Sequence, residues 1–350
     1  MIGMLRKKRF WFALALGFAV LFYTFKHADL EKLAANLHDI DRLWGCIALI
    51  ASGLSYICIA AVLYGLLRGM GHTLPFSASF RISLLSCTLN YVMAIGGLSG
   101  MAAKVYLLAR EKVLPSSTLS ISMVHGFLTN TVAVVFLYLG FFFLYSEYKL
   151  SVRELEAGFV VLLVAFLMTW ITIQTIVHEA FRKKLWRFCY NTAETLCAKL
   201  KHPRWLHRER AETFFEKFNE SMNALVGNSR ILLAPAIFAL LDWLLMLWCL
   251  KCSFLAVHYP IDNHTLLVGF SVGIFTTLFS LTPAAIGLME GSMAASFYLM
   301  GLDYDRALMA TMIYRFSYFF LPILVSVFFY KDLFTASAEH MEMGKREETV

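Results

Sequence analysis

The sequence predicts an all-α fold, a polytopic helical bundle that spans a membrane, and two observations carry this prediction. Of the 350 residues, 59% are hydrophobic and only 16% are charged, whereas an ordinary soluble domain has about 25% charged residues. Several stretches also run for more than about 18 residues with almost no charge, which is long enough to cross a bilayer. We therefore expect one integral membrane domain over residues 1–350.

Six full spans are predicted, near residues 10–27, 43–67, 118–146, 157–178, 231–257 and 306–330. The first follows a basic stretch and resembles a signal peptide. Its apolar run ends in bulky residues at 22–25 instead of the small residues of a cleavage site. We interpret it as an uncleaved helix.

Lysine and arginine gather in the N-terminal tail and in loop 178–230. The tail has four basic and no acidic residues, and the loop has eleven basic and six acidic residues. Loops 26–42 and 146–157 have more acidic than basic residues. Because basic loops stay in the cytoplasm, we expect the tail and loop 178–230 inside and the other two loops outside. The same rule accounts for the net charge of +7, so no nucleic-acid partner is expected.

Two further apolar segments are interrupted in the same way. Segment 78–110 contains a glycine-rich stretch at 96–100, and segment 265–301 contains a Pro/Gly stretch at 282–287. If the first segment crossed the membrane once, the charge bias of every later loop would be reversed. We therefore predict two re-entrant hairpins, one from each face, in an inverted-repeat arrangement. Eight simple spans are the alternative.

The long basic loop is expected to be structured. Within 179–229, apolar residues recur at helical spacing and basic residues fill the other face. This pattern indicates amphipathic helices, which either lie on the membrane surface or pack beneath the bundle. The tail at 332–350 is predicted to be cytoplasmic, like the N-terminus.

The two breaks predict a binding site. Backbone at membrane depth must be satisfied internally or line a wet cavity. A half-helix that starts near the midplane presents free N–H groups and a favourable dipole to an anion such as phosphate. We expect Gly100 and Gly287, together with Pro283, to form these half-helix starts. Lys104 and Glu290 lie one turn beyond them.

Other polar residues in the spans are candidates for the same cavity. Arg315, nine residues into the last span, is expected to pair with Glu290 or with a lipid phosphate. Asn90 is a candidate lining residue. Asp242 and His125, with Glu290, are candidates for proton or ion coupling; packing roles are the alternative for each.

Several function classes lack their signatures. The chain has no P-loop, no GxSxG and no HExxH sequence. Its seven cysteines are an odd number in mostly apolar segments, which does not indicate a disulfide framework. We therefore expect no enzymatic activity, no metal and no cofactor.

The late break resembles a known signature. Residues 282–290 read Thr-Pro-Ala-Ala-Ile-Gly-Leu-Met-Glu, and Gly301, Ala307 and Arg315 follow. This resembles the second signature of the lysylphosphatidylglycerol synthase transmembrane-region family, a Pro-Gly-Gly-x-Gly-x-x-Glu block with a downstream Gly and an Arg in the last helix. Here alanines replace the first two glycines of the block.

The first signature of that family is only partly present. Gly100 fits, and residues 104–110 resemble its continuation, but the usual proline and glutamate are absent. The resemblance implies a lipid translocase fold. In the synthase members of the family a cytosolic aminoacyl-transferase domain follows the membrane part, and we expect this chain to lack that activity.

Together these points predict a bacterial inner-membrane lipid translocase, similar to a flippase, that moves a phospholipid or lipid-linked head group through a midplane cavity. Lys104 and Arg315 would hold phosphate, and Glu290 would take a cationic group or a proton. Membrane lipids are thus the expected partners. A non-catalytic subunit of a lipid-modifying or glycosyl-transfer complex is the alternative, with a lipid-modifying enzyme as partner. A membrane enzyme acting on lipid-linked substrates is the third possibility.

Overall fold

The computed structural model describes residues 8–26, 39–92, 98–147, 151–199, 207–279, 282 and 285–330. All of its regular elements are helical. They are α2 (Lys8–Lys26), α4 (Arg42–Gly69), α5 (Phe76–Val92), α6 (Leu98–Arg110), α7 (Pro115–Glu147), α8 (Val152–Val177), α9 (Glu179–Lys199), α10 (Arg208–Gly227), α11 (Ser229–Ala256), α12 (Asn263–Phe279), α13 (Leu288–Leu299), α14 (Tyr304–Arg315) and the π-helical segment η3 (Phe316–Phe320). The predicted fold class is confirmed.

Five helices of the described residues are long and apolar enough to cross a membrane. They are Arg42–Gly69, Pro115–Glu147, Val152–Val177, Arg230–Ala256 and Tyr304–Tyr330. Each matches a predicted span, so the chain is a multi-pass membrane protein. The remaining predicted span, at 10–27, corresponds to α2, which has 19 residues and packs against α13.

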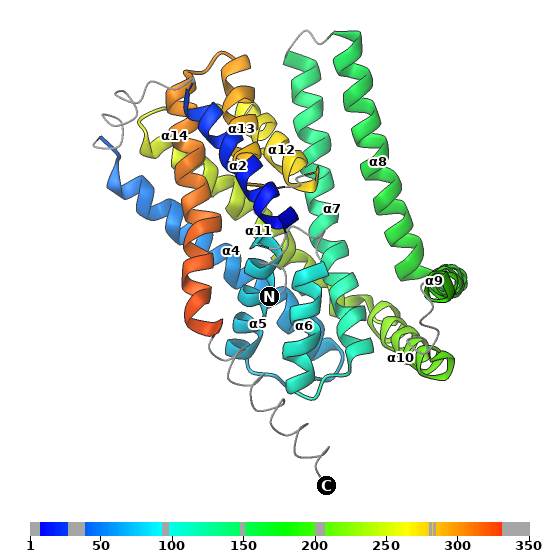
Figure 1. The fold of residues 1–350 in the computed structure, drawn as a ribbon. Helices are drawn as coiled ribbons and strands as arrows, with labels where there is room; N and C mark the ends of the chain where they lie inside the picture. The colour runs from blue at the N-terminus through cyan, green and yellow to red at the C-terminus, as the bar shows by residue number, and fades with distance from the viewer. Residues whose placement is uncertain are drawn as a thin grey trace.

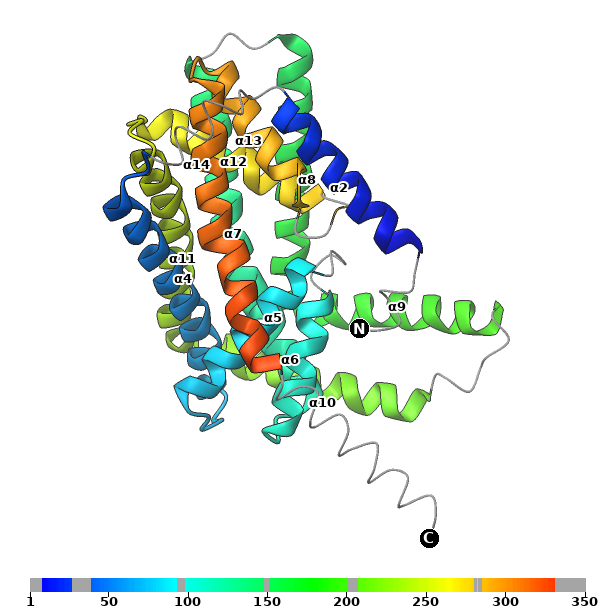
Figure 2. The same cartoon turned by 60° about the vertical axis from the view of Figure 1, so that its left-hand side comes forward.

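Both broken segments fold as helical hairpins. Helices α5 and α6 pack against each other, as do α12 and α13. At 1.5 Å per residue, the 17 residues of α5 and the 13 of α6 extend about 26 and 20 Å, less than the ~30 Å of a hydrocarbon core. Figures 1 and 2 place α5–α6 in one half of the bundle and α12–α13 in the other. This is the predicted pair of hairpins rather than eight simple spans.

The long loop is helical, as predicted, and α10 packs beneath the bundle. Phe218, Met222 and Leu225 are buried against the core. The hydroxyl of Ser120 on α7 donates to the carbonyl of Phe218 at 3.0 Å. Phe188 of α9 stays 70% exposed. Figure 2 shows α9 and α10 running across the direction of α7 and α8.

A buried arginine joins these helices to the membrane part. The Arg182 side chain, at the start of α9, is 2% exposed. It donates to the carbonyl of Ile176 at the end of α8 (2.6 Å), to Asn219 (2.8 Å) and to Asn223 on α10. It thereby satisfies a carbonyl that the end of α8 leaves without a helical partner. The sequence pattern assigned the basic residues of 179–229 to the face opposite the apolar one, and Arg182 is an exception because it is buried.

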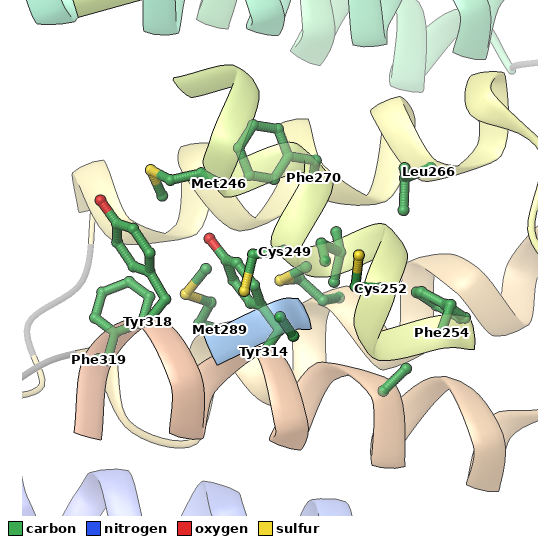
Figure 3. Packing of buried hydrophobic residues seen from close by; sticks show 14 of the residues in the cluster. Met246, Cys249, Cys252, Phe254, Leu266, Phe270, Met289, Tyr314, Tyr318 and Phe319 are labelled. Carbon is green, nitrogen blue, oxygen red and sulfur yellow. The ribbon is translucent and has the colours of Figure 1, made fainter. Parts of the chain in front are cut away.

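The main core lies among α4, α11, α12, α13 and α14. Figure 3 shows Cys249 and Met246 of α11, Met289 of α13 and Tyr314 of α14 meeting there. Small residues let the helices approach, which is the usual means of packing in a membrane. This core holds the second hairpin against the last helix.

Candidate functional site

The second break has an unusual backbone. Ala285 has φ of +53° and Gly287 has φ of +81°, both in the left-handed region that most side chains avoid. Helix α13 starts directly afterwards, at Leu288. The glycine at 287 is also required by packing, because a Cβ atom there would lie 2.3 Å from the carbonyl oxygen of Gly17 on α2. The break is therefore covered by the first helix.

Glu290 caps its own helix. Its Oε2 accepts a hydrogen bond from the N–H of Gly287 at 2.8 Å. A carboxylate at this position also interacts favourably with the helix dipole. The half-helix start that we expected to face a phosphate is thus engaged, in this structure, by a side chain of the protein.

Glu290 also forms a buried ion pair with Arg315 of α14. The Nε of Arg315 donates to Oε1 of Glu290 at 2.7 Å, and the two side chains are 0% and 1% exposed. The pairing across adjacent helices, one of the two expectations for Arg315, is therefore present. The guanidinium also lies 4.0 Å from the ring centroid of Phe319, a cation–π contact. Because both side chains are almost completely buried, this charge pair depends on its protein contacts.

A π-helical turn follows Arg315 directly. It comprises Phe316–Phe320. Two of its carbonyls accept hydrogen bonds from α4: the Ser52 hydroxyl donates to the carbonyl of Ser317 at 2.8 Å, and the Tyr56 hydroxyl donates to the carbonyl of Tyr318 at 3.0 Å. Such turns are rare and often occur at functional sites. Within it, the ring of Phe319 packs against that of Tyr91 on α5 in a tilted arrangement, with ring centroids 4.8 Å apart. Contacts thus run from Glu290 through Arg315 and Phe319 to Tyr91, from one hairpin to the other.

At the first break, the two half-helices are tied together by polar contacts. The Ser99 hydroxyl lies 3.4 Å from Oδ1 of Asn90 and 3.3 Å from the carbonyl of Leu89. A Cβ atom on Gly100 would lie 2.6 Å from the carbonyl oxygen of Ser86, so only glycine permits this crossing. Asn90 and Gly100 are therefore adjacent at the break.

Lys104 and His125 form a second group. Lys104 is half-buried and makes no hydrogen bond or ion pair with a described residue. His125 of α7 is buried, its Nδ1 has no partner among the described residues, and it lies within electrostatic range of Lys104. These groups are suited to an anion, because a lysine and an imidazole can both donate to phosphate.

Asp242 belongs to a third group. It is buried on α11, and the Ser55 hydroxyl of α4 donates to it. No hydrogen bond or ion pair joins Asp242 to Glu290, or Lys104 to Arg315, in the described part of the chain. The predicted site residues thus form three groups that no hydrogen bond or ion pair among the described residues joins directly. Pro283 lies outside the described residues.

Comparison with known proteins shows the family. Residues 10–326 match the lysylphosphatidylglycerol synthase transmembrane region. The chain belongs to this family. It is 20% identical over 339 residues, or 94% of its length, to a phosphatidylglycerol lysyltransferase of Staphylococcus haemolyticus, covering 34% of that protein. It is 24% identical over 119 residues, 34% of each chain, to a UPF0104 membrane protein of Methanothermobacter thermautotrophicus. The chain thus spans about a third of the length of these relatives.

Three residues of this site were not predicted from the sequence. The Ser55 hydroxyl donates to the carboxylate of Asp242, and the Tyr56 hydroxyl donates to a carbonyl of the π-helical turn. Phe319 connects the two hairpins through its contact with Tyr91. Ser55 and Tyr56 lie in an apolar span where no charge marks them. The aromatic run at 316–320 was the one available signal for the turn, and it does not reveal π-helical geometry.

Proposed function

We propose that this member of the family translocates a lipid, moving a phospholipid or lipid-linked head group between leaflets. One observation supports this most strongly. Two broken hairpins enter the bundle from opposite ends, and a buried ion pair with a π-helical turn connects them. Paired broken helices of opposite orientation are the arrangement that transporters use to hold a ligand at the midplane.

The proposed mechanism uses the groups already described. A lipid phosphate approaches Lys104 and His125 at the first hairpin. It then competes with Glu290 for the Arg315 guanidinium, which binds phosphate and carboxylate with the same planar fork. Protonation of Glu290 favours release of Arg315, and Asp242 is a second candidate carrier. The pair found in the structure is the resting state of this exchange.

The charge distribution supports an inner-membrane location with both termini in the cytoplasm. In this orientation α9 and α10 lie on the cytoplasmic side, where their basic residues face anionic lipids. The first hairpin then opens to the cytoplasm and the second to the outside.

Transport by purified protein tests the proposal. Proteoliposomes containing a fluorescent phosphatidylglycerol are treated with dithionite, which bleaches only the outer leaflet. We expect wild-type protein to make inner-leaflet probe accessible. Glu290→Gln combined with Arg315→Gln is expected to slow this at least about tenfold, which corresponds to 1.4 kcal/mol in the barrier.

A matched control uses the exposed ion pair of α9. Glu179→Gln with Lys183→Gln removes the same two charges from a pair that is half-exposed on both sides, and it should leave the rate unchanged. Wild-type vesicles that bleach like protein-free vesicles, with or without a pH gradient, contradict translocation. Full transport by the Glu290/Arg315 double variant contradicts the mechanism.

The alternative function, a non-catalytic subunit, has an observation of its own. Helices α9 and α10 enclose a cleft of ≈ 650 Å³ lined by charged and aromatic side chains, including Trp186, Tyr190, Arg208 and Glu212. A lipid-modifying enzyme docked in this cleft would co-purify in a fixed ratio after mild extraction. Loss of that enzyme on Trp186→Ala, together with absent lipid movement, would favour this alternative.

A further inference from the structure

A long groove lies between α7 and α8, with α12 as its floor. Two adjoining crevices of ≈ 260 Å³ each form it, and they share Leu137, Val161 and Phe275. On α7 the lining runs from Phe127 to Leu144. Those 18 residues extend about 27 Å, close to the ~30 Å of a hydrocarbon core. Figure 1 shows α8 beside α7 at the edge of the bundle, so the groove faces the surrounding membrane.

One half of the groove is apolar, and the helices around it pack closely. At Gly140 a Cβ atom would lie 2.1 Å from the hydroxyl of Ser271 on α12, and at Gly158 one would lie 1.9 Å from the ring of Phe141. These glycines therefore set how closely α7 approaches α12 and α8. The walls between them are aliphatic and aromatic. The polar side chains among its lining residues are Glu154 at the far end and Ser271, whose hydroxyl donates to the carbonyls of Phe136 and Leu267.

The other half carries polar residues at membrane depth. Thr131, Thr169 and Thr172 line it, and each hydroxyl donates to a carbonyl of its own helix. Asn130 also lines it, and its amide makes no hydrogen bond with a described residue. It lies mid-way along α7, about 22 Å from the helix start. Hydrocarbon cannot hydrogen-bond an amide at this depth.

We propose that this groove binds one glycerolipid molecule, with an acyl chain in the apolar half and the glycerol ester oxygens at Asn130. The amide supplies both a donor and an acceptor, and esters and hydroxyls are the polar groups that membrane lipids carry next to their chains. Such a lipid has its head group drawn away from its own leaflet towards the bundle centre. The inference rests on the proposed function in that it names the route by which the substrate approaches the hairpins.

The dimensions favour a lipid chain over a protein helix. Two crevices of ≈ 260 Å³ spread over this length leave a slot much narrower than a helix, which is about 10–12 Å across. A partner helix with only apolar side chains on its contact face would also leave the Asn130 amide unpaired.

Photocrosslinking tests occupancy directly. The full chain is reconstituted in vesicles of phosphatidylglycerol that include a phosphatidylglycerol with a diazirine on one acyl chain, and adducts are mapped by mass spectrometry. Adducts should concentrate on residues 127–144 and 157–172. Ala165→Trp, which fills the groove, should reduce them at least fivefold. Val160→Trp, on the exposed face of the same helix and outside the groove, should not.

A second pair of variants tests the polar contact. Asn130→Leu should reduce the same adducts several-fold, and Asn130→Ser, which replaces the amide by a hydroxyl that can also donate and accept a hydrogen bond, should retain most of them. Equal labelling in Ala165→Trp and Val160→Trp would overturn the proposal, since it would show lipid that merely coats the surface. Absence of adducts on these two ranges in the wild-type protein, as expected where another polypeptide covers the groove, would also overturn it.

The test is separable from transport. Adducts in the groove without lipid movement would support the site and contradict the proposed function. Lipid movement with adducts spread evenly over α8 would support the function and contradict the site.

Discussion

At the scale of single residues, Glu290 performs two tasks with two oxygen atoms. One oxygen caps α13 through the Gly287 N–H, and the other neutralises Arg315. A buried pair of this kind is not by itself strongly stabilising, but removing one member leaves an uncompensated charge. Stability measurements can therefore separate a packing role from a transport role.

Single and double substitutions of the pair should differ in a defined way. Glu290→Gln or Arg315→Gln alone is expected to lower the free energy of unfolding by about 3–5 kcal/mol. The double variant should lose less than the sum of the two, because it buries no unpaired charge. Thermal unfolding in detergent measures this. Additive losses would mean that the two side chains do not interact.

The backbone of the second break gives a prediction of opposite sign at two neighbouring positions. Ala285→Gly should stabilise the protein by up to about 1 kcal/mol, because it relieves a left-handed φ at a position where the family signature has glycine. Gly287→Ala should destabilise it by more than about 1 kcal/mol, since φ is positive and the added Cβ would meet Gly17. Unfolding temperatures of both variants decide the matter. A stabilising Gly287→Ala would contradict the contact with α2.

At the scale of elements, the corner between α8 and α9 depends on one side chain. Arg182 donates to the end of α8 and to two asparagines of α10. Three helices are thus joined by a guanidinium whose planar fork lysine cannot reproduce. Helices α9 and α10 can therefore open locally while the membrane-spanning helices stay folded.

Loss of this side chain should loosen α9 and α10 selectively. In Arg182→Ala, amide hydrogen exchange of these helices is expected to rise at least about tenfold, equivalent to 1.4 kcal/mol, while α4 and α11 stay protected. Lys183→Ala is the control, because its pair with Glu179 is exposed and worth about 0–1 kcal/mol. Uniform deprotection of the whole chain would show that Arg182 supports the entire fold instead.

At the scale of the whole molecule, the two hairpins fix which loops share a side. If both are re-entrant, the chain before α5 and after α6 lies on one face, and the chain before α12 and after α13 lies on the other. Eight simple spans would separate the members of each pair. Chemical accessibility in intact cells therefore distinguishes the two topologies.

Single cysteines in a cysteine-free background provide the measurement. Thr73→Cys and Glu111→Cys flank the first hairpin and should react with an impermeant maleimide only after permeabilisation. Asn263→Cys and Arg306→Cys flank the second and should react without it. All four positions are exposed. Opposite labelling of Thr73→Cys and Glu111→Cys would contradict the hairpin, and reversed labelling of all four would invert the proposed orientation.

Much of this architecture follows from one-dimensional patterns. Apolar length and charge asymmetry predicted the long helices and both hairpins because the bilayer imposes these constraints locally along the chain. Glu290 and Arg315 were predicted because charges are conspicuous in apolar segments. Their direct contact was one of two expectations, since sequence spacing does not determine how adjacent helices face each other.

The remaining features depend on tertiary contacts that leave no local trace. Ser52 and Tyr56 satisfy a turn 265 and 262 residues away, and Asn130 resembles any other polar residue in a span until α8 and α12 are in place.

The turn at Phe316–Phe320 has a mechanical consequence for Arg315. A π turn holds one residue more than an α turn, and each residue advances the helix by about 100°. If that surplus residue passes to the turn before Arg315, the guanidinium swings through about this angle and leaves Glu290, while both ends of the helix stay where they are. Arg315 can thus turn away from Glu290 while the last helix stays continuous.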